Sequence, residues 1–360
     1  DIFFVNNVTG DTLSKHIHLN YTNSKDQWST QTTLEMLEYA QIDYQLKKDT
    51  LTILKGKYSC DTNIVITKNY FTQIQAGVTL KLNSGANFIV EGSIQIKGTE
   101  EEKVRIENVK EGEPFGTFAV LGKNDNTCVE MNHIHVSGGS ESYYRGHLFT
   151  GQLAIYYSNV IILNSTFEHS HGDDGLNIKH SKVAIDNCYF INNKADQVDL
   201  DFSIATISNS HFSPSLIDYN GDGMDFSGSY AKVSNCSFDN FVDKGLSLGE
   251  RSRVLISQCK FANNASGITV KDQTTMFAWN NTFTSNSFNY SSYIKKKIFN
   301  EPQLFFNNGG EKMNVIEGNI HGITLDDWNN ENDNFSLELD KYYASNDLSQ
   351  NKSLNKIIEF

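Results

Sequence analysis

Charged and polar residues recur at matching places in five successive segments of the chain, between residues 174 and 271. Each segment has one polar residue at its start and a second three places later, and apolar residues flank the second. If the segments are β-strands stacked in register, the apolar pairs point inward and the polar residues form two outward columns. The first column reads Asp174, Asp196, Asp222, Lys244 and Ser266, and the second reads Asn177, Asp199, Asp225, Ser247 and Thr269. We call these two columns the acidic strip.

Stacked carboxylates need compensation, because neighbours one rung apart repel by about 1 kcal/mol in water and more in a sheltered groove. A bound cation, a shared proton that raises one pKa, or a facing lysine could each provide it. Carboxyls and amines in such a strip could also perform acid and base catalysis. We expect catalytic roles for Asp196, Asp199, Asp222, Asp225 and Lys244, and substrate-binding roles for Asp174, Lys179 and Lys271. The alternative is a solvated acidic face that favours turns.

A possible calcium loop overlaps the strip. The segment from Asp218 to Gly223 matches positions 1, 3, 5 and 6 of a calcium-binding loop, but position 12 is Ser229 where a glutamate is expected. A calcium ion held by Asp218 and Asp222 is one interpretation. A turn that lengthens the loop with Asn-Gly and Asp-Gly pairs is the other.

The elements that must position the strip are predicted by a repeat. Six stretches between Val160 and Phe283 carry an apolar residue, then Asn, then Phe three places later, with Gln258 replacing one Asn, and the steps are 23, 22, 26, 23 and 22 residues. The phenylalanines are Phe167, Phe190, Phe212, Phe238, Phe261 and Phe283, and the asparagines are Asn164, Asn187, Asn209, Asn235 and Asn280. A period of this size without helical spacing predicts a β-solenoid whose coils share one core.

This repeat resembles that of right-handed parallel β-helices of the pectin-lyase type. The resemblance implies an all-β fold in which the Asn column and the Phe column both point inward. Asp196 to Asp199, Asn220 to Asp225, Asp243 to Gly249 and Gly267 to Lys271 resemble, in order, the catalytic coils of polygalacturonase-type glycoside hydrolases. That resemblance implies carboxylate roles for Asp196 and Asp222 and a sugar-binding role for Lys271. Lys244, Thr269 and Gly221 stand where that family has His, Arg and Asp.

A second resemblance covers more of the chain, from about Leu51 to Lys297. The segments Asp243 to Glu250, Gly267 to Asp272 and Tyr293 to Lys297 are similar to β-helix modules found beside CotH-type kinase domains and in bacterial surface polysaccharide proteins. It implies the same fold and an extracytoplasmic setting.

Three parts of the chain are expected. Residues 1–50 lack the repeat, and the helical pattern from Thr33 to Leu46 predicts a short helix that caps the solenoid. Residues 51–300 form the β-helix. Residues 301–360 form a polar segment that packs on the β-helix or is mobile.

Composition narrows the class of protein. Thirty basic against 43 acidic residues give a net charge of −13, which argues against nucleic acid and anionic membrane surfaces as partners. No apolar run approaches the roughly 20 residues that span a bilayer. No signal peptide begins at Asp1, so we expect a processed or truncated piece of a secreted or cell-surface protein. Of the five cysteines, Cys236 and Cys259 should lie on adjacent rungs, as stacked free thiols or as a disulfide.

The sequence is consistent with two functions. In the first, a secreted or surface β-helix acts on a polysaccharide, either by hydrolysis or by β-elimination. In β-elimination, a calcium ion would bind the carboxylates and Lys244 would act as the base, which requires a lowered pKa of this lysine. In the second, the β-helix binds glycans or acts as an adhesive or scaffold without catalysis, and Asp243, Lys244, Glu250, Lys271 and Asp272 form a structural lattice of ion pairs. Solvent access to Asp196, Asp222 and Lys244 should distinguish the two.

Overall fold

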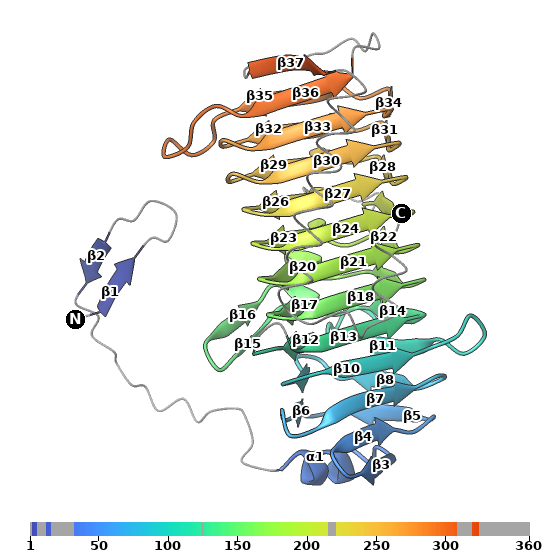
Figure 1. The fold of residues 1–360 in the computed structure, drawn as a ribbon. Coiled ribbons are helices and arrows are strands. Elements are labelled where there is room, and N and C mark those ends of the chain that lie inside the picture. The colour runs from blue at the N-terminus through green and yellow to red at the C-terminus, as the bar shows by residue number, and fades with distance from the viewer. Residues whose placement is uncertain are drawn as a thin grey trace.

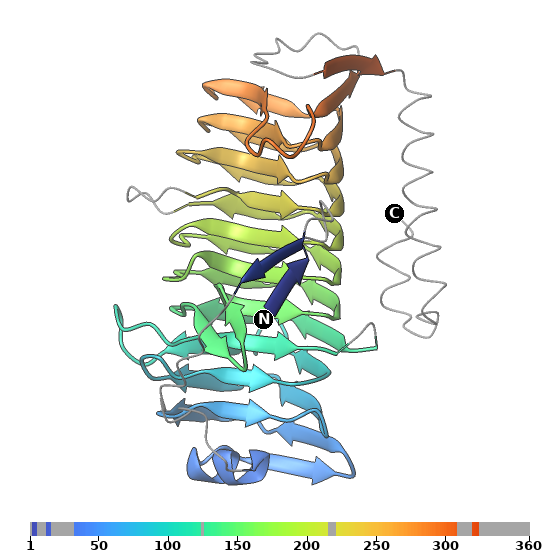
Figure 2. The ribbon, with the colours of Figure 1, turned by 90° about the vertical axis from the view of Figure 1, so that its left-hand side faces the viewer.

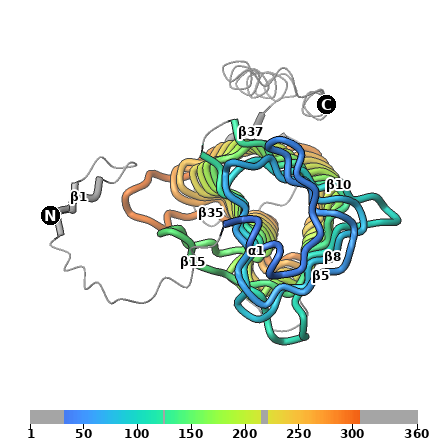
Figure 3. Tube along the Cα trace, turned by 90° about the horizontal axis from the view of Figure 1, so that it is seen from below, coloured from blue at the N-terminus to red at the C-terminus, as the bar shows by residue number. Residues whose placement is uncertain are grey.

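The computed structural model describes residues 2–5, 12–15, 32–123, 126–214, 221–307 and 319–323. Their dominant feature is a parallel β-helix, in which three strands per coil build three long sheets around one core (Figures 1 and 3). The predicted all-β solenoid is therefore confirmed. Among the described residues, no helix is long and apolar enough to cross a membrane.

Sheet I has thirteen strands, and all but its first pair run parallel. They are β3 (Tyr44–Lys47), β4 (Thr50–Ile53), β7 (Phe71–Gln75), β10 (Ile94–Lys97), β13 (Cys128–Asn132), β18 (Asn159–Leu163), β21 (Lys182–Asp186), β24 (Ile204–Ser208), β27 (Tyr230–Ser234), β30 (Arg253–Ser257), β33 (Thr275–Trp279), β36 (Gln303–Asn307) and β37 (Asn319–Ile323). The sheet thus continues beyond residue 300.

Sheets II and III have ten parallel strands each. Sheet II contains β5 (Lys57–Cys60), β8 (Thr79–Leu82), β11 (Val104–Asn108), β14 (Ile134–Ser137), β19 (Thr166–Glu168), β22 (Tyr189–Ile191), β25 (His211–Ser213), β28 (Ser237–Asp239), β31 (Lys260–Ala262) and β34 (Thr282–Thr284). Sheet III contains β6 (Ile64–Ile66), β9 (Phe88–Val90), β12 (Phe118–Leu121), β17 (Gly151–Tyr156), β20 (Asp174–Lys179), β23 (Asp196–Asp201), β26 (Met224–Ser227), β29 (Lys244–Gly249), β32 (Ser266–Lys271) and β35 (Phe288–Tyr293).

Two antiparallel hairpins lie outside these sheets, β1 (Ile2–Val5) with β2 (Thr12–Lys15), and β15 (Ser142–Tyr144) with β16 (His147–Phe149). The predicted cap helix is present as α1 (Thr33–Tyr39), which begins at a capping box formed by Thr32 and Glu35. It buries Met36 and Leu37 at the first coil but ends at Tyr39, because the chain turns there into β3. Most of the N-terminal segment before Thr32, and residues 324–360 of the expected C-terminal segment, lie outside the described residues.

The core of the β-helix is built from ladders of like residues. The six repeat phenylalanines stack one above another, with centroids 4.7–5.1 Å apart and ring planes within 13° of parallel. Stacked aromatic pairs contribute about 0.5–1.5 kcal/mol each beyond the burial of their area. The inward Phe column predicted from the repeat is confirmed.

The prediction of an inward Asn column is wrong. Asn164, Asn187, Asn209, Asn235 and Asn280 have φ angles of 50–53° and occupy the corner between sheets I and II, where their side chains are exposed or half-buried. Asn is found at these positions because it tolerates the left-handed conformation better than other non-glycine residues. The residue that follows each one points inward instead, as Cys188 and Cys236 do, and Cys259 does the same after Gln258; all three have free thiols.

A buried ladder of asparagines exists at the next corner, three residues after a phenylalanine. Asn264 is 2% exposed, and its amide accepts a hydrogen bond from the backbone N–H of Phe241 at 2.9 Å and donates one to the carbonyl of Phe238 at 2.9 Å. Asn193, which is fully buried three coils earlier, makes the equivalent bonds to Ser170 and Phe167. These amides satisfy backbone groups that no strand pairs.

Replacing a buried ladder amide should destabilise the β-helix, whereas replacing a corner asparagine should not. Asn264→Ala leaves two buried backbone groups unpaired, and each costs about 1–3 kcal/mol. We expect a clearly lower free energy of unfolding in urea for Asn264→Ala. Asn235→Gly is the matched control, because glycine keeps the left-handed turn, and it should change the unfolding free energy by less than about 0.5 kcal/mol. Equal losses in the two variants would contradict this account of the ladder.

Candidate functional site

The acidic strip lies on the outer face of sheet III, in the predicted register. Asp174 pairs with Asp196, and Asp199 lies between Asn177 and Asp225 on neighbouring strands. The inward residues of these strands, among them Leu176, Val198, Met224 and Leu246, are completely buried, so the polar residues between them must face outward. Figure 2 views this face directly, and hairpin β15–β16 and the loop of residues 294–302 both project from the same side.

The strip is sheltered without being sealed. Asp222 is 6% exposed and Asp174 is 3% exposed, while Asp196, Asp199, Asp225 and Lys244 are half-buried. Hairpin β15–β16 is held at two places. The Tyr144 hydroxyl and the Arg145 guanidinium both bind Glu91, at 2.5 and 2.6 Å. The carbonyl of Leu148 lies 2.8 Å from the hydroxyl of Tyr156, which also contacts Asn177 of the strip. The strip therefore combines a low-dielectric environment with partial solvent access.

Asp196 and Asp222 are coupled through a short contact. Oδ1 of Asp196 accepts a hydrogen bond of 2.7 Å from the backbone N–H of Asp222, and the two side chains lie in adjacent coils. Burial, followed by repulsion from Asp222, raises the pKa of Asp196 to about 9. Burial also raises the pKa of Asp222, but the Lys244 ammonium holds it to about 6. At neutral pH, Asp196 is therefore protonated and Asp222 is mostly ionised.

Two further carboxyls of the strip also have raised pKa values. Burial is the main cause that raises the pKa of Asp174 to about 7 and the pKa of Asp199 well above its usual range. Oδ2 of Asp199 accepts a 2.8 Å hydrogen bond from Nδ2 of Asn177, whose Oδ1 lies 2.7 Å from the hydroxyl of Tyr156. Protons thus provide part of the compensation that the stacked carboxyls need.

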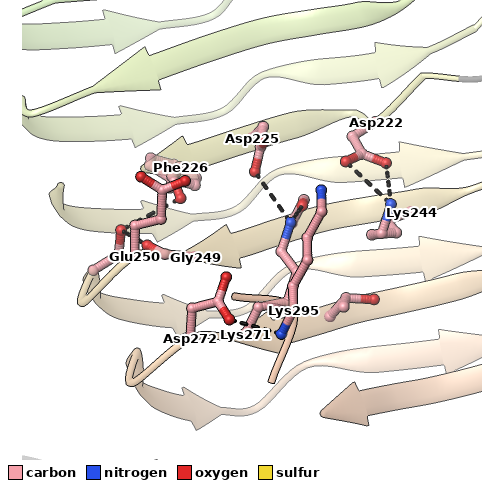
Figure 4. A network of polar contacts seen from close by, with 12 residues as sticks. Asp222, Asp225, Phe226, Lys244, Gly249, Glu250, Lys271, Asp272 and Lys295 are labelled. Carbon is pink, nitrogen blue, oxygen red and sulfur yellow. Dashed lines mark hydrogen bonds and ion pairs between the residues drawn. The ribbon is translucent and has the colours of Figure 1, made fainter. Parts of the chain in front are cut away.

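Lysines provide the rest (Figure 4). Lys244 Nζ lies 3.1 Å from Asp222 Oδ1 and also pairs with Asp243. Burial would lower the pKa of Lys244, but these two carboxylates raise it instead, which is the opposite of what a lysine base in β-elimination requires. Lys271 Nζ donates to Ser247 Oγ at 2.7 Å and lies 3.8 Å from Asp225.

Three carboxylates could hold a cation. One oxygen from each of Asp196, Asp222 and Asp225 lies within 4.8 Å of the others, which suits a hard divalent ion with oxygen ligands. Asp218, the other predicted calcium ligand, lies outside the described residues. The same distances are shorter than the roughly 6.5–9.5 Å that separates the two carboxyls of an inverting glycosidase.

Sequence reasoning missed several residues of the site. Asp201 pairs with Lys179 at 2.8 Å, a contact that the pairing of their strands could have indicated. Lys295, on the loop after β35, lies beside Lys271 (Figure 4). It is held there because Asp272 Oδ1 accepts hydrogen bonds from the backbone N–H groups of Lys295 and Lys296, at 2.7 and 2.8 Å. The Lys-Lys-Lys run marks this loop, but nothing in the sequence places it over the strip.

Comparisons with known proteins agree with the fold. The family model for the right handed beta helix region matches residues 151–336, which include the whole acidic strip. No curated protein matches this sequence.

Solved structures of similar shape have low sequence identity. The periplasmic alginate epimerase AlgG is 12% identical with a TM-score of 0.52, over 76% of this chain and 85% of that chain. The enzymatically active domain of tailspike protein 2 from bacteriophage CBA120 is 10% identical with a TM-score of 0.55, over 76% of this chain and 47% of that chain. At this identity, both likenesses are evidence of the fold alone.

The raised pKa of Asp196 has a consequence for stability. A carboxyl with a raised folded-state pKa stabilises the fold fully below its unfolded pKa, and this contribution is lost as the pH rises through the folded pKa. Between about pH 4 and 9, Asp196 alone should lower the free energy of unfolding by up to about 1.4 kcal/mol per pH unit. Urea unfolding of the parent should therefore show a steeper loss of stability between pH 5 and 8 than that of Asp196→Asn.

The control is Glu111→Gln, which removes an exposed carboxylate in the loop after β11 and should keep the slope of the parent. Parallel pH profiles for the parent and Asp196→Asn would contradict the protonated state of Asp196.

Proposed function

Because this chain belongs to the right-handed β-helix family, we propose that it is a secreted or cell-surface protein that acts on a polysaccharide along the outer face of sheet III. The observation that carries the proposal is the pair of Asp196 and Asp222, which lie in adjacent coils with their pKa values moved apart, to about 9 and about 6. Opposite protonation of two neighbouring carboxyls is what acid and base catalysis at neutral pH requires.

The similar structures support the substrate class. One is an alginate epimerase and the other is the enzymatically active domain of a tailspike protein, so this fold carries enzymes, one of them named for a polysaccharide. A long, shallow sheet face between two projecting loops also suits an extended chain of sugars better than a small molecule (Figure 2). The periplasmic setting of the epimerase is consistent with a location outside the cytoplasm.

Glycoside hydrolysis fits the geometry better than β-elimination. Asp196 would give its proton to the leaving glycosidic oxygen, while Asp222 would attack the anomeric carbon and form a glycosyl ester. The short distance between their oxygens, at most 4.8 Å, is near the roughly 5–5.5 Å of carboxyl pairs that work in this way. Water, activated by the deprotonated Asp196, would then release the sugar and restore both carboxyls. Lys244 would keep Asp222 ionised.

A bound calcium ion is the alternative way to offset the repulsion between the carboxylates of the strip. If Asp196, Asp222 and Asp225 bind a divalent cation, the proton on Asp196 is displaced and Asp196 can no longer serve as the acid. A calcium requirement and acid catalysis by Asp196 are therefore mutually exclusive in this proposal, and the assay below separates them.

A second function is favoured by one specific observation. Both central lysines are engaged in buried polar contacts, Lys244 with Asp222 and Asp243 and Lys271 with Ser247 and Asp225. These contacts match the structural lattice of a non-catalytic β-helix that binds glycans or serves as a scaffold. Such a protein should bind a glycan on sheet III without cleaving it.

We expect the protein to cleave at least one glycan in a panel of neutral and acidic polysaccharides. Cleavage is measured by the release of reducing ends. Loss of a general acid or its partner lowers rates by about 10²–10⁴-fold, so Asp196→Asn and Asp222→Asn should each lose activity on this scale. Asp239→Asn, on β28 of sheet II, is the control for a half-buried carboxyl away from the strip and should keep the parent rate.

Absorbance of unsaturated uronates is followed in parallel, since its appearance would mean β-elimination. Activity that survives EDTA and produces reducing ends alone supports Asp196 as the acid, whereas activity that requires calcium contradicts it. Glycan binding without cleavage, weakened by substitutions in the strip, would establish the non-catalytic function.

A further inference from the structure

The outer face of sheet I changes character along the solenoid. In the first coils, its central outward column is polar, and Gln73, Gln95 and Glu130 are linked by side-chain hydrogen bonds of 3.0 and 2.7 Å. From the coil of β18 onward, the same column becomes mostly apolar. Its members there are Ile161, Ala184, Thr206, Lys232, Leu255, Phe277 and Phe305.

Apolar residues of this column are buried although they point away from the core. Leu255 is 1% exposed and Phe277 is 5% exposed, while their strand neighbours Val254 and Met276 fill the interior. With Ile204, Trp279 and Phe305, they form an apolar cluster separate from the core of the β-helix. The rings of Phe277 and Phe305 stack at 4.7 Å. An outward cluster of this kind must be covered in solution, because contact between apolar side chains and water is unfavourable.

We propose that the occupant of this face is the C-terminal segment of the same chain, residues 324–360. Sheet I ends at β37, one rung beyond β36, so the segment starts at the edge of the very sheet that carries the cluster. Thirty-seven residues follow Ile323, and they include apolar side chains such as Trp328, Phe335 and Ile357. A tether this short gives the segment a high effective concentration at the face.

Charge favours the same occupant. Residues 324–360 contain eight acidic residues and three lysines. The outer face of sheet I carries Lys182, Lys232 and Arg253 around the apolar column. Lys232 is half-buried, and burial lowers its pKa, which an acidic neighbour would offset. A second copy that met this face with its own sheet I would bring lysines and arginine against lysines and arginine instead. The docked segment would leave sheet III as the face open to glycans.

Hydrogen exchange on the full chain tests the proposal. In the parent, backbone amides within residues 324–360 should exchange at least about tenfold more slowly than in Phe277→Glu, which puts a carboxylate into the docking face. Tyr189→Glu is the matched control, an outward aromatic residue that is 51% exposed on β22 of sheet II, and it should leave the protection unchanged. Leu255→Glu is the second variant and should repeat the effect of Phe277→Glu.

Hydrogen exchange in the strands of sheet III shows whether the β-helix of each variant is still folded. Light scattering gives the mass of each variant in solution, and therefore its oligomeric state. Loss of protection in the C-terminal segment with sheet III unchanged supports the docking. A segment that exchanges freely in the parent, or that stays equally protected in both glutamate variants, overturns it. A parent that is dimeric, and that both glutamate variants convert to monomers without a change in the segment, means that a second copy covers the face and also overturns it.

Discussion

The in-register stacking of parallel coils is the constraint on which the rest of this structure depends. Strands about 4.8 Å apart place each residue directly above its counterpart in the next coil. A column of phenylalanines gains from this arrangement, and the rings from Phe167 to Phe283 stack in parallel through the core. A column of carboxylates is destabilised by it, so Asp174, Asp196, Asp199 and Asp222 can share one face only because the fold keeps protons on some of them and places lysine ammonium groups beside others.

That compensation is also what gives the face its chemistry. Burial keeps Asp196 protonated, while Lys244 keeps Asp222 ionised at a distance of 3.1 Å, so two equivalent side chains acquire opposite roles. The arrangement costs stability above pH 4, because the folded state must retain protons that the unfolded chain releases. Active sites are where proteins commonly tolerate such a cost. The ion pairs of Lys244 and Lys271 fix the geometry of the strip, whichever function it serves.

Sequence reasoning reached the fold because its signal is repeated, and the register of the strip followed from that repeat together with the alternation of apolar and polar residues. The prediction failed at the corners between sheets, where asparagines recur at more than one corner of the coil. The column at Asn187 was expected inward, yet its φ of 53° turns the side chain to solvent, and the buried amide ladder runs through Asn193 and Asn264. The split of the carboxyl pKa values could not be predicted either, since it depends on how deeply each side chain is buried. The approach of Lys295 depends on a loop conformation that Asp272 fixes.

The central claim is that Asp196 carries a proton in the folded protein at neutral pH. Infrared spectroscopy of the folded chain tests it directly, through the C=O stretch of protonated carboxyls, with Asp196→Asn as the reference. The account predicts a protonated-carboxyl band at pH 7 that is smaller in Asp196→Asn, and the difference between the two spectra should fall to about half as the pH reaches about 9. A spectrum at pH 7 that contains carboxylate bands alone, identical in the parent and the variant, would contradict it.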